Sequence, residues 1–425
     1  MNILEHVLSA QKGNESKGIP SVCSANPWVL KAVMKRAAKM DGTVLIEATC
    51  NQVNQFGGYT GMTPVDFVGY VHKIAKESGL PAQSVLLGGD HLGPNVWQNE
   101  PADSAMNKAT DMMGDYLRAG FVKIHLDASM KLADDPDGFL DPEISARRAA
   151  TLAKAAEAAR STGGVAPLYV IGTEVPVPGG AQEHEDGVSV TSVESVQQTI
   201  EITHEAFRRE GLEDAWERVI AVVVQPGVEF GDDFVLEYDP KAAGELTRYI
   251  ESQPRLIYEA HSTDYQTRQS LKNLVDDHFA ILKVGPGLTF TLREAIYALA
   301  AIEDELFSTE NRSNLIAVLD QAMLEQPGHW QKYYPGTAEY QHFARKYSLS
   351  DRIRYYWPVP KVDVALNKLL QNLTLNPIPW PLLSQFLPVQ YGRIRQGRLR
   401  NTVDEIILDR ISDVLADYDY ASGAL

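Results

Sequence analysis

The sequence predicts an α/β protein built on a (β/α)₈ TIM barrel with a mostly helical C-terminal extension. Short apolar, β-branched runs recur eight times between residues 19 and 285, and turns rich in Gly, Asn, Asp or Pro separate them from segments with helical periodicity. Eight alternating units are the number that closes a parallel barrel, and doubly wound open sheets usually have fewer. After about residue 307 this alternation stops.

Each expected strand is followed by an expected helix. The strands are Ile19–Ser24, Val44–Thr49, Ser84–Gly89, Phe121–Asp127, Leu168–Glu174, Val219–Gln225, Arg255–His261 and Phe279–Gly285. The helices are Pro27–Met40, Pro64–Ser78, Ser104–Ala119, Pro142–Thr162, Val193–Arg209, Lys241–Ser252, Tyr265–Asp277 and Leu292–Leu306. We therefore expect a barrel over residues 1–308 and a helical extension over 309–425. Aromatic residues at 329–336 and 351–358 suggest that the extension packs on the barrel.

Composition limits the location and the partners. The chain of 425 residues has 39 Lys and Arg against 56 Asp and Glu, a net charge of -17, which argues against binding to nucleic acid or to anionic membranes. No apolar run is long enough to cross a bilayer, and the N-terminus lacks the features of a signal peptide. The two cysteines, Cys23 and Cys50, do not form a disulfide framework, so we expect a cytoplasmic protein.

Polar residues cluster at the carboxyl ends of the expected strands, where barrel enzymes build their active sites. Period-2 spacing puts Glu47, Thr49 and Asn51 on one face of their strand. It likewise puts Lys123, His125 and Asp127 on one face. Other strand ends carry Asp90, His91, Glu174, Gln225, Glu259, His261 and Lys283. This convergence predicts a functional site at the barrel mouth, with Glu47 and Asp127 binding substrate.

His91 and His261 are the two histidines that end strands, and with Glu174 or Gln225 they suit a divalent metal with open positions for substrate. A Lewis acid on a carbonyl and an adjacent hydroxyl stabilises an enediolate, the intermediate of aldol cleavage or sugar epimerisation. Asp90 is then the expected general acid/base, Glu174 its catalytic partner, and Lys283 the neutralising cation. A metal-free network of histidines and carboxylates is the alternative, and His125 is equally consistent with a hydrogen-bonded core histidine.

Three turns after strands offer backbone N–H groups to a phosphate: Gly179–Gly180, Ser262–Thr263, and Gly285–Thr289, which includes Gly287. Arg352 and Arg354 lie among aromatic residues of the extension, and we expect one of them to bind the substrate's terminal phosphate. The alternative is an arginine pair bound to acidic neighbours. No Gly-x-x-x-x-Gly-Lys-Ser/Thr or Gly-x-Gly-x-x-Gly loop occurs, which argues against a nucleotide-dependent kinase.

Several long motifs resemble the GatZ/KbaZ family: IEATCNQVNQFGGYTGMTP (46–64), GGDHLGPNVWQ (88–98), KIHLDASM (123–130), YVIGTEVPVPGG (169–180), VVVQPGVEF (222–230), YEAHSTDYQTR (258–268), FAILKVGPGLTF (279–290) and YSLSDRIRYYWP (347–358). The resemblance covers almost the whole chain. Members are known as non-catalytic, chaperone-like subunits of class II D-tagatose-1,6-bisphosphate aldolase. Some are labelled tagatose 6-phosphate kinases, and some are implicated as 4-epimerases that interconvert D-tagatose 6-phosphate and D-fructose 6-phosphate.

The family is in turn similar to the zinc-dependent class II aldolases. That likeness implies a metal held by His91, His261 and, where those enzymes have a third histidine, Gln225, with Zn²⁺ as the expected ion. A neutral amide is a weaker ligand, which implies reduced aldolase activity or a site shifted towards Glu174. We expect a ketose-phosphate 4-epimerase with a phosphorylated ketohexose as substrate, and a stabilising subunit of the aldolase as the alternative. The expected partners are therefore a catalytic aldolase subunit or a second copy of the chain.

Overall fold

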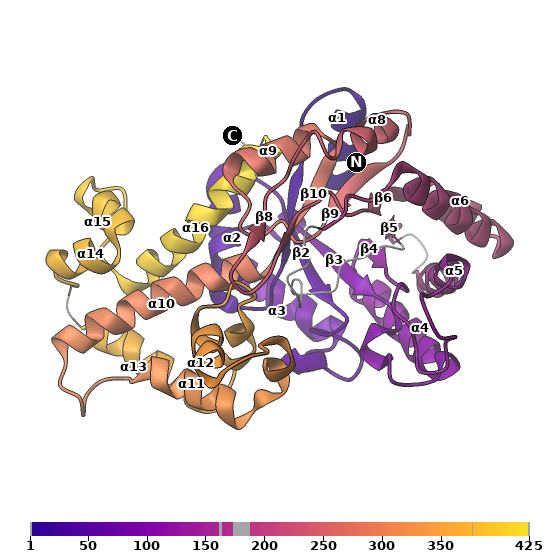
Figure 1. Ribbon diagram of the computed structural model, residues 1–425. Helices are drawn as coiled ribbons and strands as arrows, with labels where there is room; N and C mark the ends of the chain where they lie inside the picture. The colour runs from indigo at the N-terminus through magenta and orange to yellow at the C-terminus, as the bar shows by residue number, and fades with distance from the viewer. Residues whose placement is uncertain (1, 161–163, 173–187, 376, 424–425) are drawn as a thin grey trace.

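The computed structural model describes residues 2–160, 164–172, 188–375 and 377–423, and its centre is a closed barrel of eight parallel strands (Figure 1). Around the barrel the order is β1-β10-β9-β6-β5-β4-β3-β2. The strands are β1 (Ile19–Cys23), β2 (Val44–Thr49), β3 (Val85–Leu92), β4 (Lys123–Leu126), β5 (Leu168–Ile171), β6 (Val219–Val223), β9 (Ile257–Ala260) and β10 (Phe279–Val284). The predicted (β/α)₈ barrel is therefore confirmed.

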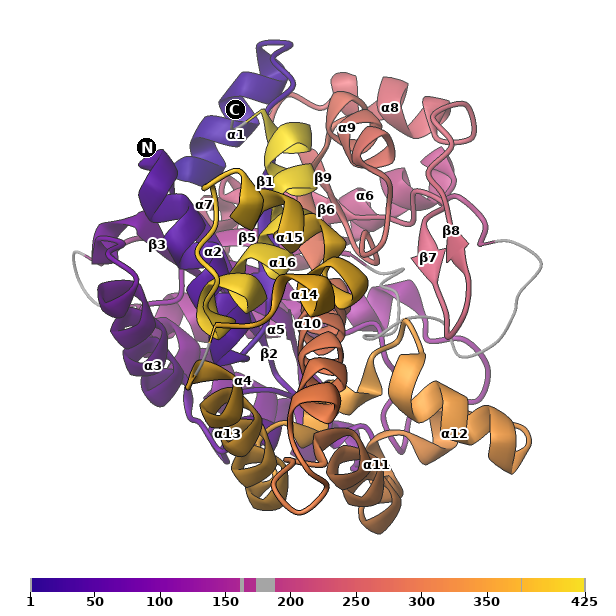
Figure 2. The same cartoon turned by 90° about the vertical axis from the view of Figure 1, so that its left-hand side faces the viewer.

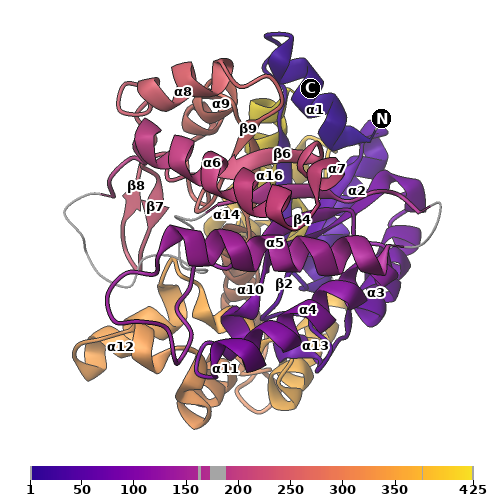
Figure 3. The same ribbon diagram turned by 90° about the vertical axis from the view of Figure 1, so that its right-hand side faces the viewer.

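Helices cover the outside of the barrel, as the alternating pattern predicts. They are α2 (Pro27–Met40), α3 (Pro64–Glu77), α4 (Ala102–Ala119), α5 (Pro142–Ala159), α6 (Val193–Arg209), α7 (Glu213–Trp216), α8 (Gly244–Glu251), α9 (Arg268–Asp276) and α10 (Pro286–Leu306). Figure 3 shows α4, α5 and α6 side by side on one flank. A small hairpin, β7 (Glu229–Phe230) and β8 (Val235–Leu236), lies between β6 and α8.

A helix that the sequence pattern did not indicate, α1 (Ile3–Lys12), closes the amino end of the barrel. Asn2 and Glu5 start it with a reciprocal capping box, in which each side chain accepts the other's backbone N–H. Its buried Leu4 and Val7 pack with inward-facing apolar residues of the strands, including Ile220 and Ile257. Figure 2 shows α1 at the opposite end of the barrel from α11 and α12, so the mouth lies under the extension.

The residues after α10 form α11 (Leu315–Glu325), α12 (Ala338–Tyr347), α13 (Pro360–Thr374), α14 (Trp380–Phe386), α15 (Pro388–Arg395) and α16 (Val403–Ser422). The last of these, α16, returns to the barrel and packs against α2, α9 and α10. The carbonyl of Ser422 accepts the backbone N–H of Gly18, just before β1, at 3.1 Å. The division into 1–308 and 309–425 stays a prediction. Among the described residues, none of the helices combines the length and apolar character that crossing a bilayer requires.

Some element ends differ from the predicted ones in ways that matter for the site. Strand β3 continues to Leu92, so Asp90 and His91 lie within the strand, just before its last residue, and not in the following turn. Strand β6 ends at Val223, which leaves Gln225 in a turn. Helix α10 begins at Pro286, six residues before the predicted start, because Pro suits the first helical position and fixes φ there. Its first backbone N–H groups therefore face the barrel mouth.

The turn after β3 requires glycine at position 93. A Cβ at Gly93 would lie 1.6 Å from the carbonyl oxygen of Asp127, a backbone atom that no rotamer change can move. This approach holds the ends of β3 and β4 together, where Asp127 N donates to the carbonyl of Leu92 at 3.1 Å.

Gly93→Ala should therefore lower the free energy of unfolding by more than about 3 kcal/mol, measured by urea denaturation. Gly69→Ala is the matched control, because Gly69 lies in α3 with open space around its added Cβ. That control should stabilise the chain by about 0.5–1 kcal/mol. Equal stability of the two variants would contradict the requirement for glycine at position 93.

Candidate active site

A chain of buried ion pairs crosses the centre of the barrel. Lys123 Nζ lies 2.7 Å from Glu47 Oε1 and 2.6 Å from Glu259 Oε2, and all three side chains are fully buried. Lys283 Nζ contacts Glu47 and lies 2.9 Å from Asp90 Oδ2. Gly88 leaves the room for this, since a Cβ there would lie 2.5 Å from Glu47 Oε1. Period 2 directs these side chains from β2, β4, β9 and β10 towards the barrel axis.

The pairing decides the charges of both lysines. Burial by itself would lower the pKa of Lys123, but Glu259 and Glu47 outweigh it and raise that pKa above its ordinary value. For Lys283, burial is likewise opposed by Asp90 and further neighbours, and its pKa is raised well above the usual range. Both lysines are therefore ammonium ions at neutral pH. Lys283 is a cation beside Asp90 and not the neutral amine that a Schiff base would need.

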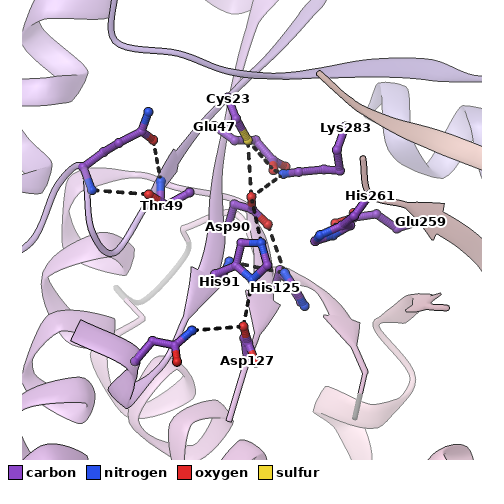
Figure 4. Close-up of polar contacts among 12 residues, drawn as sticks. Cys23, Glu47, Thr49, Asp90, His91, His125, Asp127, Glu259, His261 and Lys283 are labelled. Atoms are coloured by element: carbon purple, nitrogen blue, oxygen red, sulfur yellow. Dashed lines mark hydrogen bonds and ion pairs between the residues drawn. The ribbon is translucent and has the colours of Figure 1, made fainter. Parts of the chain in front are cut away.

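Three histidines lie together beside this network, one each from β3, from β4 and from the residue after β9 (Figure 4). The ring centroids lie 5.1 Å apart for His91 and His125, and 4.9 Å apart for His91 and His261. The pair His125 and His261 is 5.2 Å apart. His91 has a φ of 47°, in the left-handed region, where a non-glycine residue is uncommon and often functional.

Each of these imidazoles has one ring nitrogen held by a carboxylate. His91 Nδ1 lies 2.7 Å from Asp127 Oδ2, and His261 Nε2 lies 3.0 Å from Glu259 Oε1. His125 Nδ1 lies 3.0 Å from Asp90 Oδ1. His125 Nδ1 also accepts the backbone N–H of His91 at 3.2 Å. Contacts to one ring nitrogen fix the orientation of each ring and leave the other nitrogen to bind a metal. His125 Nε2 is buried and has no hydrogen-bond partner among the described residues, so it is free to act as a metal ligand.

Asp90, His91, His125 and His261 fit a metal ion by a further criterion, because each offers a ligand atom within 4.8 Å of all the others. Three imidazoles and a carboxylate are ligands that zinc prefers. Cys23, Glu47 and Asp90 also lie close together, but the ammonium of Lys283 lies among them. There the Cys23 thiol donates to Asp90 Oδ2 at 3.3 Å, and burial raises its pKa well above the usual value.

The pKa values of Asp90 and His261 are both lowered, but for different reasons. Burial would raise the pKa of Asp90, but the charges of His91 and Lys283 overcome it and hold that pKa well below its usual range. Burial lowers the pKa of His261 to about 4, although Glu259 acts against it. Asp90 is therefore a carboxylate and His261 a neutral imidazole at neutral pH.

The structure places Gln225 differently from the expected ligand position. Its side-chain Oε1 accepts the backbone N–H groups of Gly227 at 2.8 Å and Val228 at 3.0 Å, so it stabilises the turn after β6. The third imidazole of the cluster is His125, from β4. Its period-2 spacing with Lys123 and Asp127 was the available signal, but spacing does not distinguish a ligand from a core histidine. Glu174, Gly179 and Gly180 lie outside the described residues.

Most of the turn groups expected to bind phosphate are engaged within the chain. Thr263 Oγ1 donates to the carbonyl of Lys283 at 2.6 Å, and Thr289 Oγ1 donates to Asp351 Oδ2 at 2.6 Å. The backbone N–H groups of Gly285 and Gly287 both donate to Asp264 Oδ1. Sequence spacing did not indicate Asp264, which is separated from these glycines by a helix and a strand. Ser262, with a φ of 53°, lines the cavity described next.

A cavity of about 850 Å³ lies between the barrel mouth and the extension. On the barrel side it reaches Asp90, His91, His261 and Lys283. On the extension side a 3₁₀ helix, Arg352–Tyr356, contributes Arg352, Arg354 and Tyr355. This volume suits a small-molecule ligand.

Arg352 and Arg354 lack acidic partners, in a chain with a net charge of -17. The Arg354 guanidinium donates to the backbone carbonyls of Ser350 and Asp351 and to Tyr355 Oη at 2.9 Å. The Arg352 guanidinium stacks 3.1 Å over the ring of Tyr333 and donates to the carbonyl of His329 at 3.4 Å. Within the described part of the chain no carboxylate lies within 4.0 Å of either guanidinium. Arg352 is buried and Arg354 half-buried, and two guanidinium groups that line a cavity without a carboxylate in direct contact suit the binding of an anion.

Similar proteins share both the sequence and the fold. The chain matches the family described as D-tagatose-1,6-bisphosphate aldolase subunit GatZ/KbaZ-like over residues 4–423. It is 52% identical over 418 residues to the D-tagatose-1,6-bisphosphate aldolase subunit GatZ of Salmonella typhimurium, covering 98% of each chain. The protein of that name from Salmonella enteritidis is 51% identical over 418 residues, again with 98% of each chain covered.

A solved structure extends the likeness to three dimensions. The crystal structure of a probable tagatose 6 phosphate kinase from Sinorhizobium meliloti 1021 superposes with a TM-score of 0.88 at 47% sequence identity, covering 96% of this chain and 100% of that one. The match spans the barrel and the extension alike. The chain therefore belongs to the GatZ/KbaZ-like family of D-tagatose-1,6-bisphosphate aldolase subunits.

Proposed function

We propose that this chain acts in carbohydrate metabolism on phosphorylated ketohexoses, and that its barrel mouth is a metal-assisted site rather than a remnant. The observation that carries the proposal is the convergence of three carboxylate-oriented histidines, Asp90 and Lys283 beneath two unpaired arginines. Each buried charge costs desolvation free energy, and a purely structural barrel has no need of them in its centre.

In this proposal His91, His125 and His261 hold a divalent ion, with zinc as the candidate, and Asp90, whose oxygens contact His125 and Lys283, lies beside it. When bound, the ion supplies Lewis acidity to the ketose carbonyl and its neighbouring hydroxyl. Gln225, the ligand expected from the sequence, has no part in it, because its Oε1 is committed to the turn after β6.

The protein's own groups then carry the proton and the charge. As a carboxylate, Asp90 accepts the proton of the substrate's C4 hydroxyl while the bond between C3 and C4 breaks and leaves an aldehyde. The electron pair of that bond stays on the ketone-bearing fragment, near the ammonium of Lys283. Return of the pair to the other face of the aldehyde, with the proton returned from Asp90, inverts C4. Arg352 and Arg354 hold the phosphate meanwhile, so the aldehyde fragment is retained.

The names of the relatives favour a second candidate more directly than they favour an epimerase. Those proteins are called subunits of D-tagatose-1,6-bisphosphate aldolase, and this chain resembles them over 98% of its length. A subunit that stabilises a separate catalytic chain fits that name without any reaction at this site. The name of the Sinorhizobium meliloti protein suggests a kinase, but no nucleotide-binding loop accompanies the site in this sequence.

One incubation separates these functions. The purified chain alone, loaded with zinc, should convert D-tagatose 6-phosphate to D-fructose 6-phosphate without ATP, followed by a coupled assay. Formation of D-tagatose 1,6-bisphosphate and ADP when ATP is supplied would favour the kinase. Absence of any conversion, together with stimulation of an added catalytic aldolase subunit, would favour the stabilising role.

His125→Ala should reduce bound zinc to well below one ion per chain while the fold is kept, measured by elemental analysis after loading and dialysis. Losing one of three imidazole ligands should cost at least about 10-fold to 100-fold in metal affinity. Gln225→Ala is the matched control and should keep its zinc. If the control loses the ion and His125→Ala keeps it, the ligand set is wrong.

Asp90→Asn should keep substrate affinity within about threefold and lower kcat by about 10²–10⁴-fold, because a neutral amide cannot accept the hydroxyl proton. Asp363→Asn provides the comparison, since Asp363 lines the same cavity on its exposed rim. Full turnover in Asp90→Asn would exclude Asp90 as the proton carrier.

Arg352→Ala and Arg354→Ala should each weaken binding of D-tagatose 6-phosphate by about 1.5–3 kcal/mol, the value of a charge-assisted hydrogen bond. Unphosphorylated D-tagatose should bind nearly as well to the variants as to the parent chain, as measured by KM. Arg268→Ala, which removes an exposed arginine paired with Asp417, should change neither. Equal losses for both sugars would show that the arginines do not recognise phosphate.

A further inference from the structure

A carboxylate of the chain itself occupies the position where barrels frequently bind phosphate. That position is formed by the loops after the last two strands and a following helix N-terminus. Here Asp264 follows β9, and its Oδ1 accepts the backbone N–H of Gly285 at 2.9 Å and that of Gly287 at 2.7 Å. We call these two N–H groups the amide cradle. They are among the N–H groups that the start of α10 leaves without helical partners.

Burial and the close approach of Gly287 hold Asp264 in this position. Its side chain is buried, with 4% of the residue exposed, yet it forms part of the cavity wall. A Cβ on Gly287 would lie 3.0 Å from Asp264 Oδ1, so the glycine keeps the approach open. Burial raises the pKa of Asp264 to about 6, with the two amide hydrogen bonds acting the other way, so it is mainly ionised at neutral pH.

An ionised Asp264 affects the two ends of a ketose differently. A phosphate brought to the amide cradle would meet an oxygen already bound there and a negative charge of the same sign. A hydroxyl group, by contrast, can donate a hydrogen bond to the carboxylate. Arg352 and Arg354, which the extension contributes to the cavity lining, remain available for one phosphate.

We propose that Asp264 is a specificity-determining residue that closes the amide cradle to phosphate, so that the cavity takes ketohexoses carrying one phosphate and rejects their bisphosphates. The inference rests on the proposed function for the site as a sugar-phosphate site. It assigns the single phosphate to Arg352 and Arg354, and the free hydroxymethyl end of the sugar to Asp264.

Calorimetric titration of the zinc-loaded full chain with D-tagatose 6-phosphate and with D-tagatose 1,6-bisphosphate tests it. The parent chain should bind the bisphosphate at least about tenfold more weakly than the monophosphate. Asp264→Ser frees the cradle and removes the charge, and should tighten bisphosphate binding by at least about tenfold with monophosphate binding changed less than about threefold. Asp264→Asn removes the charge and keeps an oxygen on the amides, so its bisphosphate affinity should fall between the two.

Asp363→Asn is the matched control, because it removes one negative charge from the rim of the cavity without touching the cradle. It should leave the preference for the monophosphate unchanged. A parent chain that binds both sugars equally, or an Asp264→Ser variant that folds with the parent's melting temperature and gains no bisphosphate affinity, would overturn the inference. Asp264→Asn is isosteric and decides the question if the serine variant does not fold.

Titration with inorganic phosphate separates this inference from the proposed function. If the parent chain binds neither sugar phosphate, the proposed function fails. The cradle is then judged on inorganic phosphate alone. A phosphate site that appears in Asp264→Ser and is missing from the parent chain and from Asp363→Asn supports the role of Asp264. The same phosphate affinity in all three chains contradicts it.

Discussion

The ion pairs between Lys123 and its partners Glu47 and Glu259 set the geometry of the whole barrel mouth. A barrel centre is normally filled by apolar layers, and a charge placed there is tolerated only when partners compensate its lost hydration. Here each charge has such a partner, and members of the network also contact residues of the histidine cluster. Glu259 orients His261, and Lys283 joins Glu47 to Asp90. Removal of Lys123 would leave Glu259 without an ammonium partner, and removal of Lys283 would do the same to Asp90.

The histidine cluster depends on this base in a direct way. Asp90 orients His125 through one oxygen and contacts Lys283 through the other, so the position of the imidazole follows from the ion network below it. Asp127 orients His91. The close contact between Gly93 and the carbonyl of Asp127 keeps the ends of β3 and β4 together. The site is therefore rigid on the barrel side, a property that favours ligand binding with little reorganisation.

The extension completes the site from the other side. The 3₁₀ helix Arg352–Tyr356 brings two cations over the cavity, while α16 returns to the barrel, where Tyr418 Oη donates to the carbonyl of Thr263 at 2.9 Å. Asp264 follows Thr263 directly, so the last helix supports the loop that fills the amide cradle. In the proposed function, the guanidinium groups of the extension therefore bind the anion in place of the backbone N–H groups of the barrel.

The sequence by itself determined the barrel, because strand and helix periodicity are local properties that repeat eight times. It also located Asp90, His91, His261 and Lys283 at the mouth, because the carboxyl ends of parallel strands meet at one edge. The tertiary structure alone decided that His125 and not Gln225 joins the cluster, and that Asp264 fills the cradle of Gly285 and Gly287. Spacing along a strand reports which face a side chain occupies. Which partner it meets depends on residues far apart in the chain, and only the folded barrel brings those together.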